Sequence, residues 1–270
     1  MEGDIVGKHV FVVCAYKESI YLEECIQSLK RQTIPSNIIM VTSTPNKYIE
    51  DLAEKYDLPC YVNPGQGGIT QDWNYGYKCA KEIKGVRYVT IAHQDDIYEP
   101  EYLAHALISF KHSKKPLIFF TDYYEIRNGQ RVEKDQLLLI KRIMLLPLRV
   151  RMFQGCRWIR RRVLSFGSPI CCPSVCFAIK NMPDIIFRDG FLACEDWEAW
   201  EMLSKREGEF LYCKEILMGH RIHEESVTSA IIHDNKRSDE EYKMFRKFWP
   251  ERIAKLLVRL YSVGQKSNQL

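Results

Sequence analysis

The chain has 270 residues, of which 46% are hydrophobic and 27% are charged. This length suits one large domain or two small ones, and the composition excludes a disordered chain, a collagen and a coiled coil. No apolar run approaches the roughly 18 to 20 residues that a membrane-spanning helix needs, and residues 1–8 lack the basic and then apolar start of a signal peptide. These features predict a cytoplasmic protein.

The net charge of +4 is distributed unevenly. Residues 141–162 carry eight Lys or Arg and no acid, so the rest of the chain carries a net charge of −4. No recognisable nucleic-acid-binding module accompanies this basic segment, which argues against nucleic acid as a partner. Apolar residues alternate with its cations, a pattern that favours peripheral contact with an anionic membrane surface or an anionic substrate. The alternative is a solvated basic flank of a helix.

The ten cysteines offer no paired framework. Most are scattered, and the cluster of Cys171, Cys172 and Cys176 lacks a second pair at zinc-binding spacing. Reduced, mostly buried thiols are therefore expected, rather than disulfides or a zinc site.

Strands and helices alternate through the first half of the chain. Continuous apolar, β-branched runs predict buried strands at residues 10–15, 38–41, 60–62, 86–92 and 117–121. Helical spacing of apolar residues predicts helices at residues 22–29, 48–56, 72–84 and 102–112. This order predicts an α/β fold with a mostly parallel central sheet flanked by helices.

The second half predicts fewer, shorter elements. A strand is expected within residues 169–179, a helix from Glu195, and two short strands at residues 210–213 and 216–222. Residues 238–241 form the pattern of a capping box for a helix through Phe248, and Pro250 suits the start of a last helix. One domain over residues 1–235 is expected, with residues 236–270 as a C-terminal helical extension packed on it.

Two polar segments follow predicted strands, at the edge of an open α/β sheet where ligands bind. Residues 15–18 follow the first strand and are not glycine-rich, which argues against a P-loop or a dinucleotide fingerprint. Asp95 and Asp96 follow the fourth strand and can offer oxygens to a divalent cation that also binds a nucleotide diphosphate. Taken alone, the Asp pair has a turn or a helix cap as its alternative.

Further carboxylates and imidazoles lie later in the chain. Residues 195–197 (Glu-Asp-Trp) begin a predicted helix, and residues 220–228, which include His220 and His223, are expected on a loop. Such groups suit a proton-abstracting base, a metal site or an anion clamp. For His220 a structural role is the favoured interpretation.

These segments together resemble the family-2 glycosyltransferases of the GT-A fold. The resemblance spans roughly residues 10–228 and rests on the order of segments 15–18 with 22–33, 93–98, 195–197, and 220–223 with 226–228. It implies a GT-A type nucleotide-binding fold with added C-terminal helices. It also implies an inverting transferase that moves a sugar from a nucleotide-sugar donor, usually a UDP-sugar, to an acceptor hydroxyl in polysaccharide or glycoconjugate synthesis. The acceptor would be a saccharide or a lipid-linked saccharide.

The resemblance also implies roles for individual residues. Asp95 matches the last acid of the family's Asp-x-Asp motif and, with His223, would bind Mn²⁺ or Mg²⁺. Asp196 would be the catalytic base, with Glu195 and Trp197 on the acceptor side. The residues expected to bind the donor are Ala15, Tyr16, Glu18, Asp72, Asn74, Gln94 and Asp95. A structural histidine, a helix cap and a core tryptophan are the alternatives for His223, Glu195 and Trp197.

Two departures from the family pattern bear on the donor. His93 stands where the first acid of Asp-x-Asp is usual, and residues 41–45 (Val-Thr-Ser-Thr-Pro) replace the common Asp-Asp-Gly-Ser run. The nucleobase is therefore less defined than the diphosphate. Two other classes of function stay open: a metal-dependent nucleotidyltransferase or phosphohydrolase using Asp95, Asp96 and His223, and a non-catalytic module that binds sugars or membranes.

Overall fold

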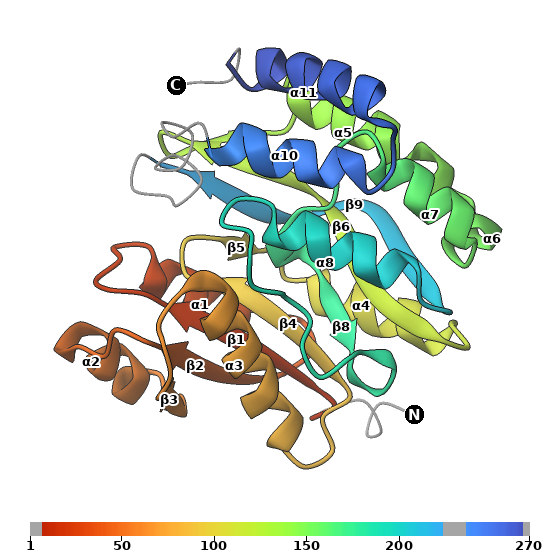
Figure 1. Ribbon diagram of the computed structural model, residues 1–270. Helices are drawn as coiled ribbons and strands as arrows, with labels where there is room; N and C mark the ends of the chain where they lie inside the picture. Colours follow the sequence, from red (N-terminus) through yellow and green to blue (C-terminus); the bar gives the residue numbers. More distant parts are fainter. Residues whose placement is uncertain (1–6, 224–235, 267–270) are drawn as a thin grey trace.

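The computed structural model describes residues 7–223 and 236–266 (Figure 1). Its strands form one sheet in the order β3-β2-β1-β4-β8-β6-β9-β5, with β7 paired to β6. The strands are β1 (His9–Ala15), β2 (Asn37–Thr42), β3 (Cys60–Val62), β4 (Tyr88–His93), β5 (Ile97–Tyr98), β6 (Pro116–Arg127), β7 (Gln130–Val132), β8 (Cys176–Ala178) and β9 (Glu209–Ile222).

Helices connect these strands and cover both faces of the sheet (Figure 1). The α-helices are α1 (Leu22–Lys30), α2 (Lys47–Lys55), α3 (Ile69–Glu82), α4 (Tyr102–Lys111), α5 (Gln136–Leu145), α6 (Arg151–Gln154), α7 (Arg157–Leu164), α8 (Glu195–Ser204), α10 (Lys236–Arg246) and α11 (Glu251–Lys266). The 3₁₀ helices are η1 (Leu146–Arg149), η2 (Cys172–Ser174) and η3 (Ile179–Asn181).

The central strand β1 shows why its sequence is apolar throughout. Successive side chains of a strand point to opposite faces, and both faces here are covered. Val10 and Val12 pack with α3 and α8 in one core, whereas Phe11 and Val13 pack with α1, α2 and α4 in the other. The predicted α/β fold with a central sheet flanked by helices is confirmed.

The sheet is parallel over β3, β2, β1 and β4 and again between β6 and β9. These parallel ladders hold most of the paired residues, so the expected mostly parallel sheet is confirmed. The antiparallel pairs are shorter: β5 with β9, β7 with β6, and β8 with both β4 and β6. Through its two pairs, β8 joins the two parallel parts. Strand β8 thereby places β6 and β9, from the later part of the chain, in the same sheet as β1 and β4.

Two strand predictions need correction. The two short strands expected at 210–213 and 216–222 are one strand, β9, which stays paired to β6 through a register irregularity at Asp122. Strand β6 likewise continues to Arg127 because β9 and β7 extend the sheet beside it. The strand expected within residues 169–179 is confirmed as Cys176–Ala178, and the η2 turn precedes it.

The predicted capping box is wrong. Helix α10 already includes Ser238, and Arg237 forms an ion pair with Glu241 one turn later, at 3.1 Å. Glu240 instead accepts hydrogen bonds from the N–H groups of Leu192 and Ala193 in the loop before α8. Pro250 directly precedes α11, as predicted.

The C-terminal helices contribute to the main core. Met244 and Phe245 of α10 and Ala254 of α11 are fully buried and belong to the same cluster as Trp197 and Trp200 of α8. The boundary expected between residues 235 and 236 falls next to a segment outside the described residues. Over the described ranges, none of the helices has both the length and the apolar character to cross a bilayer.

Candidate active site

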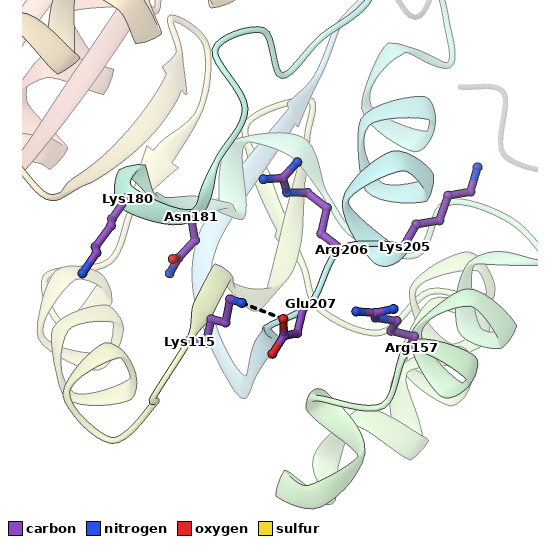
Figure 2. Close-up of a pocket in the computed structure, with 7 residues that line it drawn as sticks. All are labelled: Lys115, Arg157, Lys180, Asn181, Lys205, Arg206 and Glu207. Carbon is purple, nitrogen blue, oxygen red and sulfur yellow. Dashed lines mark hydrogen bonds and ion pairs between the residues drawn. The ribbon is translucent and has the colours of Figure 1, made fainter.

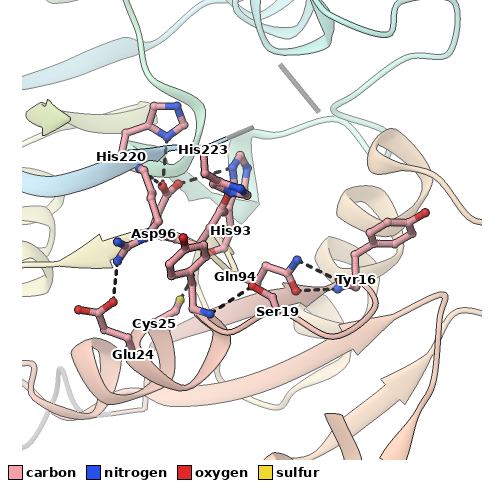
Figure 3. A network of polar contacts seen from close by, with 12 residues as sticks. Tyr16, Ser19, Glu24, Cys25, His93, Gln94, Asp96, His220 and His223 are labelled. Carbon is pink, nitrogen blue, oxygen red and sulfur yellow. Dashed lines mark hydrogen bonds and ion pairs between the residues drawn. The ribbon is translucent and has the colours of Figure 1, made fainter. Parts of the chain in front are cut away.

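Three chain segments meet at the carboxyl ends of β1, β4 and β9 (Figure 3). Gln94 connects the loop after β4 to the loop after β1. Its side-chain oxygen accepts the N–H of Tyr16 at 2.8 Å, and its amide donates to the Tyr16 carbonyl at 3.1 Å. Lys17 adopts a left-handed conformation (φ 54°), and its N–H donates to the Thr44 hydroxyl at 2.6 Å. The loop after β1 is therefore held against the loop after β4.

Asp96 joins β4 to the end of β9. Its carboxylate is fully buried and binds the N–H of Arg221 at 2.9 Å and His220 Nδ1 at 3.1 Å. The guanidinium of Arg221 donates to the Asp95 carbonyl at 2.9 Å and to Glu24 of α1 at 2.6 Å. Burial opposes protonation of His220, but the Asp96 charge and hydrogen bond raise its pKa to about 8. This structural contact for His220 agrees with the interpretation favoured from the sequence.

Asp95 is the more accessible carboxylate of the pair. Its Oδ2 lies 2.9 Å from Nε2 of His223, and each side chain is about one-fifth exposed. Burial by itself raises the pKa of Asp95, but the His223 hydrogen bond and the charges of His93, His220 and His223 together lower it. The structure thus brings together the two residues predicted to bind the metal. Residues 226–228, part of the same motif, lie outside the described residues.

His93 belongs to this cluster too. Its ligand atoms and those of Asp95 and Asp96 all lie within 4.8 Å of one another. Its ring stacks on Trp73 at 4.9 Å between centroids, and burial lowers its pKa, which favours the neutral imidazole. Nε2 of His93 and Oδ2 of Asp96 are buried with no hydrogen-bond partner among the described residues. A neutral imidazole beside carboxylates is a donor set that fits a divalent cation.

The other predicted donor residues differ in accessibility. Tyr16 and Glu18 are exposed on the loop after β1, while Ala15 is buried at the end of the strand. Asp72 of α3 is buried and accepts hydrogen bonds from Ser43 at 2.6 Å and Asn63 at 2.8 Å. It therefore lies behind the loops that follow β2 and β3.

Asn74 contacts another part of the chain. Its side-chain oxygen accepts the N–H groups of Ile186 and Phe187, both at 3.2 Å, and its amide donates to the Phe187 carbonyl at 2.6 Å. Both ends of this side chain are thus bonded to the backbone at residues 186–187, so any effect of Asn74 on a donor would pass through that loop.

Asp196, the predicted base, lies in the first turn of α8. Its carboxylate accepts the N–H of Trp197 and lies 3.4 Å from the Ser168 hydroxyl. Burial raises the pKa of Asp196, although the Trp197 N–H and the charges of Lys141 and Arg237 act against the rise. Burial and the charges of Asp96 and Asp196 raise the pKa of the Cys171 thiol. Cys171 is therefore within electrostatic reach of both the histidine–aspartate cluster and the predicted base.

The two residues predicted on the acceptor side, Glu195 and Trp197, differ in the surroundings of their side chains. Glu195 is 7% exposed, and burial, with the charges of Asp196 and Glu240, raises its pKa to about 7. The acceptor-side prediction for Trp197 is wrong for its side chain, which is 1% exposed and donates to the Leu164 carbonyl at 2.9 Å. Because α10 and α11 cover the indole, it is a core residue.

Lys141 was not among the predicted site residues. Its Nζ donates to the Tyr123 hydroxyl at 2.7 Å, and its charge lowers the pKa of Asp196. The Tyr123 ring lies 6.2 Å from the ring of His220, which bonds to Asp96. The only signal in the sequence was its place at the start of the basic segment.

A cavity of about 510 Å³ lies at the opposite edge of the sheet, where β6 and β9 begin (Figure 2). Its lining includes Lys115, which pairs with Glu207 at 2.8 Å, and four further cations: Arg157, Lys180, Lys205 and Arg206. None of the predicted site residues lines it. The candidate site is therefore the convergence of loops, and this cavity is separate from it.

Comparison with known proteins agrees with this arrangement. Residues 10–167, more than half of the chain, match the family model of glycosyl transferase family 2. No curated protein matches the sequence significantly.

Solved structures match the fold at low sequence identity. Residues 1–349 of S. aureus TarS in complex with UDP-GlcNAc share 17% identity, with a TM-score of 0.58 over 93% of this chain and 70% of that chain. The mannosyltransferase PcManGT from Pyrobaculum calidifontis, in complex with GDP-Man and Mn²⁺, shares 12% identity, with a TM-score of 0.60 over 94% of this chain and 69% of that chain. The chain belongs to glycosyl transferase family 2 and has the GT-A fold of this family.

Proposed function

We propose that this protein is an inverting glycosyltransferase that uses a nucleotide-sugar donor, a UDP-sugar in the first instance. The observation that carries the proposal is the cluster of His93, Asp95 and Asp96, with His223 bonded to Asp95, beside the loop of Tyr16. Asp196 and Asp96 both act electrostatically on Cys171, so the proposed base lies on the same side of the molecule as this cluster. The neighbouring structures hold UDP-GlcNAc or GDP-Man, which supports a nucleotide-sugar donor.

We infer that His93, Asp95 and His223 would hold a divalent cation. When bound, such a cation neutralises charge on the departing diphosphate as a Lewis acid. Imidazole nitrogens are unusual ligands for Mg²⁺, which prefers oxygen, so the donor set favours Mn²⁺. The Mn²⁺ in the Pyrobaculum mannosyltransferase structure is consistent with this choice.

Asp196 is the proposed base. A bond forms between the acceptor oxygen and the anomeric carbon while the bond from that carbon to the diphosphate oxygen breaks, with inversion, and the acceptor proton passes to Asp196. Burial raises the pKa of Asp196, which makes it a stronger base than an exposed aspartate, and the Lys141 charge acts to keep it ionised. Glu195, whose pKa is raised in part by the charge of Asp196, would bind the acceptor beside this base.

The remaining details of the proposal concern partners and place. The acceptor is a saccharide or lipid-linked saccharide in polysaccharide or glycoconjugate synthesis, and the protein acts in the cytoplasm. Asp72 contributes to the donor site through Ser43, which occupies the loop where the family's acidic run is missing. Tyr16 and Glu18 contact the nucleoside from the loop after β1.

The test is thermal stability with UDP and GDP, each in Mn²⁺ and in EDTA. A ligand at 100 times its dissociation constant adds about 2.7 kcal/mol, so binding produces a clear shift in Tm. Wild type should shift with UDP only when Mn²⁺ is present, and Asp95→Asn should lose this shift. Asp196→Asn should keep the shift and lose sugar transfer by about 10²- to 10⁴-fold.

A control variant is Asp184→Asn, which removes a carboxylate that is 94% exposed and pairs with Lys81. It should match wild type in both assays. Equal Mn²⁺-dependent UDP binding by wild type and Asp95→Asn would show that Asp95 does not hold the cation. Pyrophosphate release from a nucleoside triphosphate, without sugar transfer from any donor, would instead support a nucleotidyltransferase.

A further inference from the structure

Helix α5 buries Leu138 and Leu145 but also exposes apolar side chains on another face. Lys141 donates to the Tyr123 hydroxyl, and Arg142 donates to the carbonyls of Tyr123 at 2.9 Å and Glu133 at 2.6 Å, so both cations bind the protein. The large apolar side chains between and beside them are 46–58% exposed: Leu139, Ile140 and Ile143. A surface helix of a globular protein ordinarily turns its apolar stripe to the core, so this face needs another partner.

The exposed apolar residues continue beyond α5. Seven of the 18 exposed large hydrophobic residues in the described chain lie within residues 139–158. They are Leu139, Ile140, Ile143, Leu146, Val150, Met152 and Trp158. With the exposed Arg149, Arg151, Arg157 and Arg162 they form what we call the α5–α7 face. Such a concentration is not the scattered exposure that any surface shows.

The charge of the α5–α7 face restricts the class of partner. Residues 136–167 contain no acid. Trp158 is 66% exposed, and the Arg162 guanidinium lies 5.5 Å from its ring centre. Tryptophan favours the membrane–water interface, and arginine among apolar side chains suits an anionic bilayer, where the cations bind phosphate while the apolar groups enter the acyl boundary.

Helix α11 adds a second exposed apolar stripe beside α5 (Figure 1). Ile253, Leu256 and Leu260 are 41–62% exposed and follow helical spacing. The Lys141 charge of α5 lowers the pKa of Tyr261 of α11, which burial raises, so the two helices lie within electrostatic reach of each other. The apolar surface thus extends across elements that are about 110 residues apart in the sequence.

We propose that the α5–α7 face, with the outer stripe of α11, binds the surface of an anionic lipid bilayer. The helices lie in the plane of the interface, since none of those described is able to span it. Lys141 of α5 binds the Tyr123 hydroxyl, and its charge lowers the pKa of Asp196. A bilayer bound to the outer face of α5 would therefore lie one helix away from the proposed base. The inference rests on this surface and is independent of the donor chemistry.

Vesicle flotation tests the proposal, using phosphatidylcholine vesicles with and without phosphatidylglycerol. Wild type should float with the anionic vesicles and bind neutral vesicles at least about tenfold more weakly, because each surface cation contributes to binding an anionic leaflet. The double variant Leu139→Ser/Ile143→Ser should lose about tenfold or more in binding. Arg151→Gln/Arg157→Gln should lose a similar factor, and the loss should shrink at high salt.

Matched controls change the same residue types elsewhere on the surface. Ile108→Ser/Ile185→Ser removes two exposed isoleucines, and Lys84→Gln/Lys111→Gln removes two exposed cations. Both controls should float as wild type does. Absence of flotation with anionic vesicles, or equal flotation of wild type and Leu139→Ser/Ile143→Ser, would overturn the proposal.

Two further readouts separate this proposal from others. Light scattering would detect a protein partner surface: self-association that is lost in Leu139→Ser/Ile143→Ser, without vesicle binding, would assign the face to a second copy of the chain and overturn the lipid proposal. The Mn²⁺-dependent UDP shift in Tm should be the same in all four variants. A protein that floats but binds no nucleotide would contradict the proposed function and leave the membrane surface supported.

Discussion

Burial raises the pKa of both carboxylates at the start of α8. Glu195 is 7% exposed and its pKa is raised from 4.5 to about 7, first by burial and then by the charges of Asp196 and Glu240. Between these pH values the unfolded chain loses the proton while the folded protein retains it. The free energy of unfolding therefore falls as pH rises through this window, by up to about 3 kcal/mol from this one group.

Glu195→Gln should remove that part of the pH dependence. The amide stays neutral in both states, so the variant should gain stability relative to wild type by up to about 3 kcal/mol between about pH 5 and about pH 8. Urea denaturation at several pH values measures the difference. Glu251→Gln, at an exposed carboxylate that pairs with Lys255, is the control and should follow the wild-type curve. Parallel curves for Glu195→Gln and wild type would show that Glu195 is ionised in the folded protein.

Sequence reasoning found the residues whose chemistry is local. Asp95 follows an evident buried strand, and such strands bring their carboxyl ends to one edge, so its approach to His223 was predictable. His93 departs from the family pattern, in which an acid is usual at this position. The sequence did not predict that His93 is neutral, because this depends on its burial in the folded protein, where its ring also stacks on Trp73. The burial of Trp197 and the approach of Lys141 to Asp196 depend on packing between distant helices, which a single sequence does not specify.

At the scale of elements, the packing of α3 on the sheet depends on one small residue. A Cβ added at Gly76 would lie 2.5 Å from Cγ1 of Val12 in β1 and 3.5 Å from Cγ2 of Val41 in β2. Helix propensity favours alanine at this position by about 1 kcal/mol, whereas overpacking a buried contact costs about 1 to 3 kcal/mol. Because Val12 is fully buried in a central strand, the steric cost should exceed the gain.

Gly76→Ala should therefore lower the free energy of unfolding by about 1 to 2 kcal/mol. The urea midpoint measures this, and Gly155→Ala, whose Cβ would meet only Glu209 at 3.7 Å, should cost less than about 0.5 kcal/mol. In the Val12→Ala background the cost of Gly76→Ala should shrink, because the contacting methyl group is absent. An increase in stability for Gly76→Ala alone would show that α3 is free to move away from β1.

Sequence patterns predicted the first helices and strands well, because each of these helices carries an apolar stripe and the buried strands are continuous apolar runs. They failed where an element is shaped by its neighbour. Strand β9 looked like two strands because its residues 214 and 215 are polar and exposed, yet pairing with β6 continues on both sides of them. The position of β8, antiparallel between β4 and β6, follows from long-range pairing of only three residues, too few for a sequence pattern.

At the scale of the whole molecule, the C-terminal helices complete the layer that contains α8. Phe245 of α10 is fully buried, with its ring edge against Trp197 at 5.0 Å and against Tyr261 of α11 at 5.8 Å. Trp197 follows the proposed base directly, so the same contacts that hold α10 and α11 also fix the first turn of α8. The contacts within this layer should therefore stabilise the whole fold, and the protein should unfold in a single transition.

Phe245→Ala should lower the free energy of unfolding by about 3 to 5 kcal/mol, because it leaves a cavity among aromatic rings. Tryptophan fluorescence, which includes Trp73 near the N-terminal strands, and helical circular dichroism should give the same shifted midpoint. Leu256→Ala, at a side chain of α11 that is 56% exposed, is the control and should change stability by less than about 0.5 kcal/mol. Phe245→Leu, with a smaller loss, provides a variant that stays folded. Two separate transitions instead of one would mean that α10 and α11 unfold as a separate extension, and that the start of α8 is held without them.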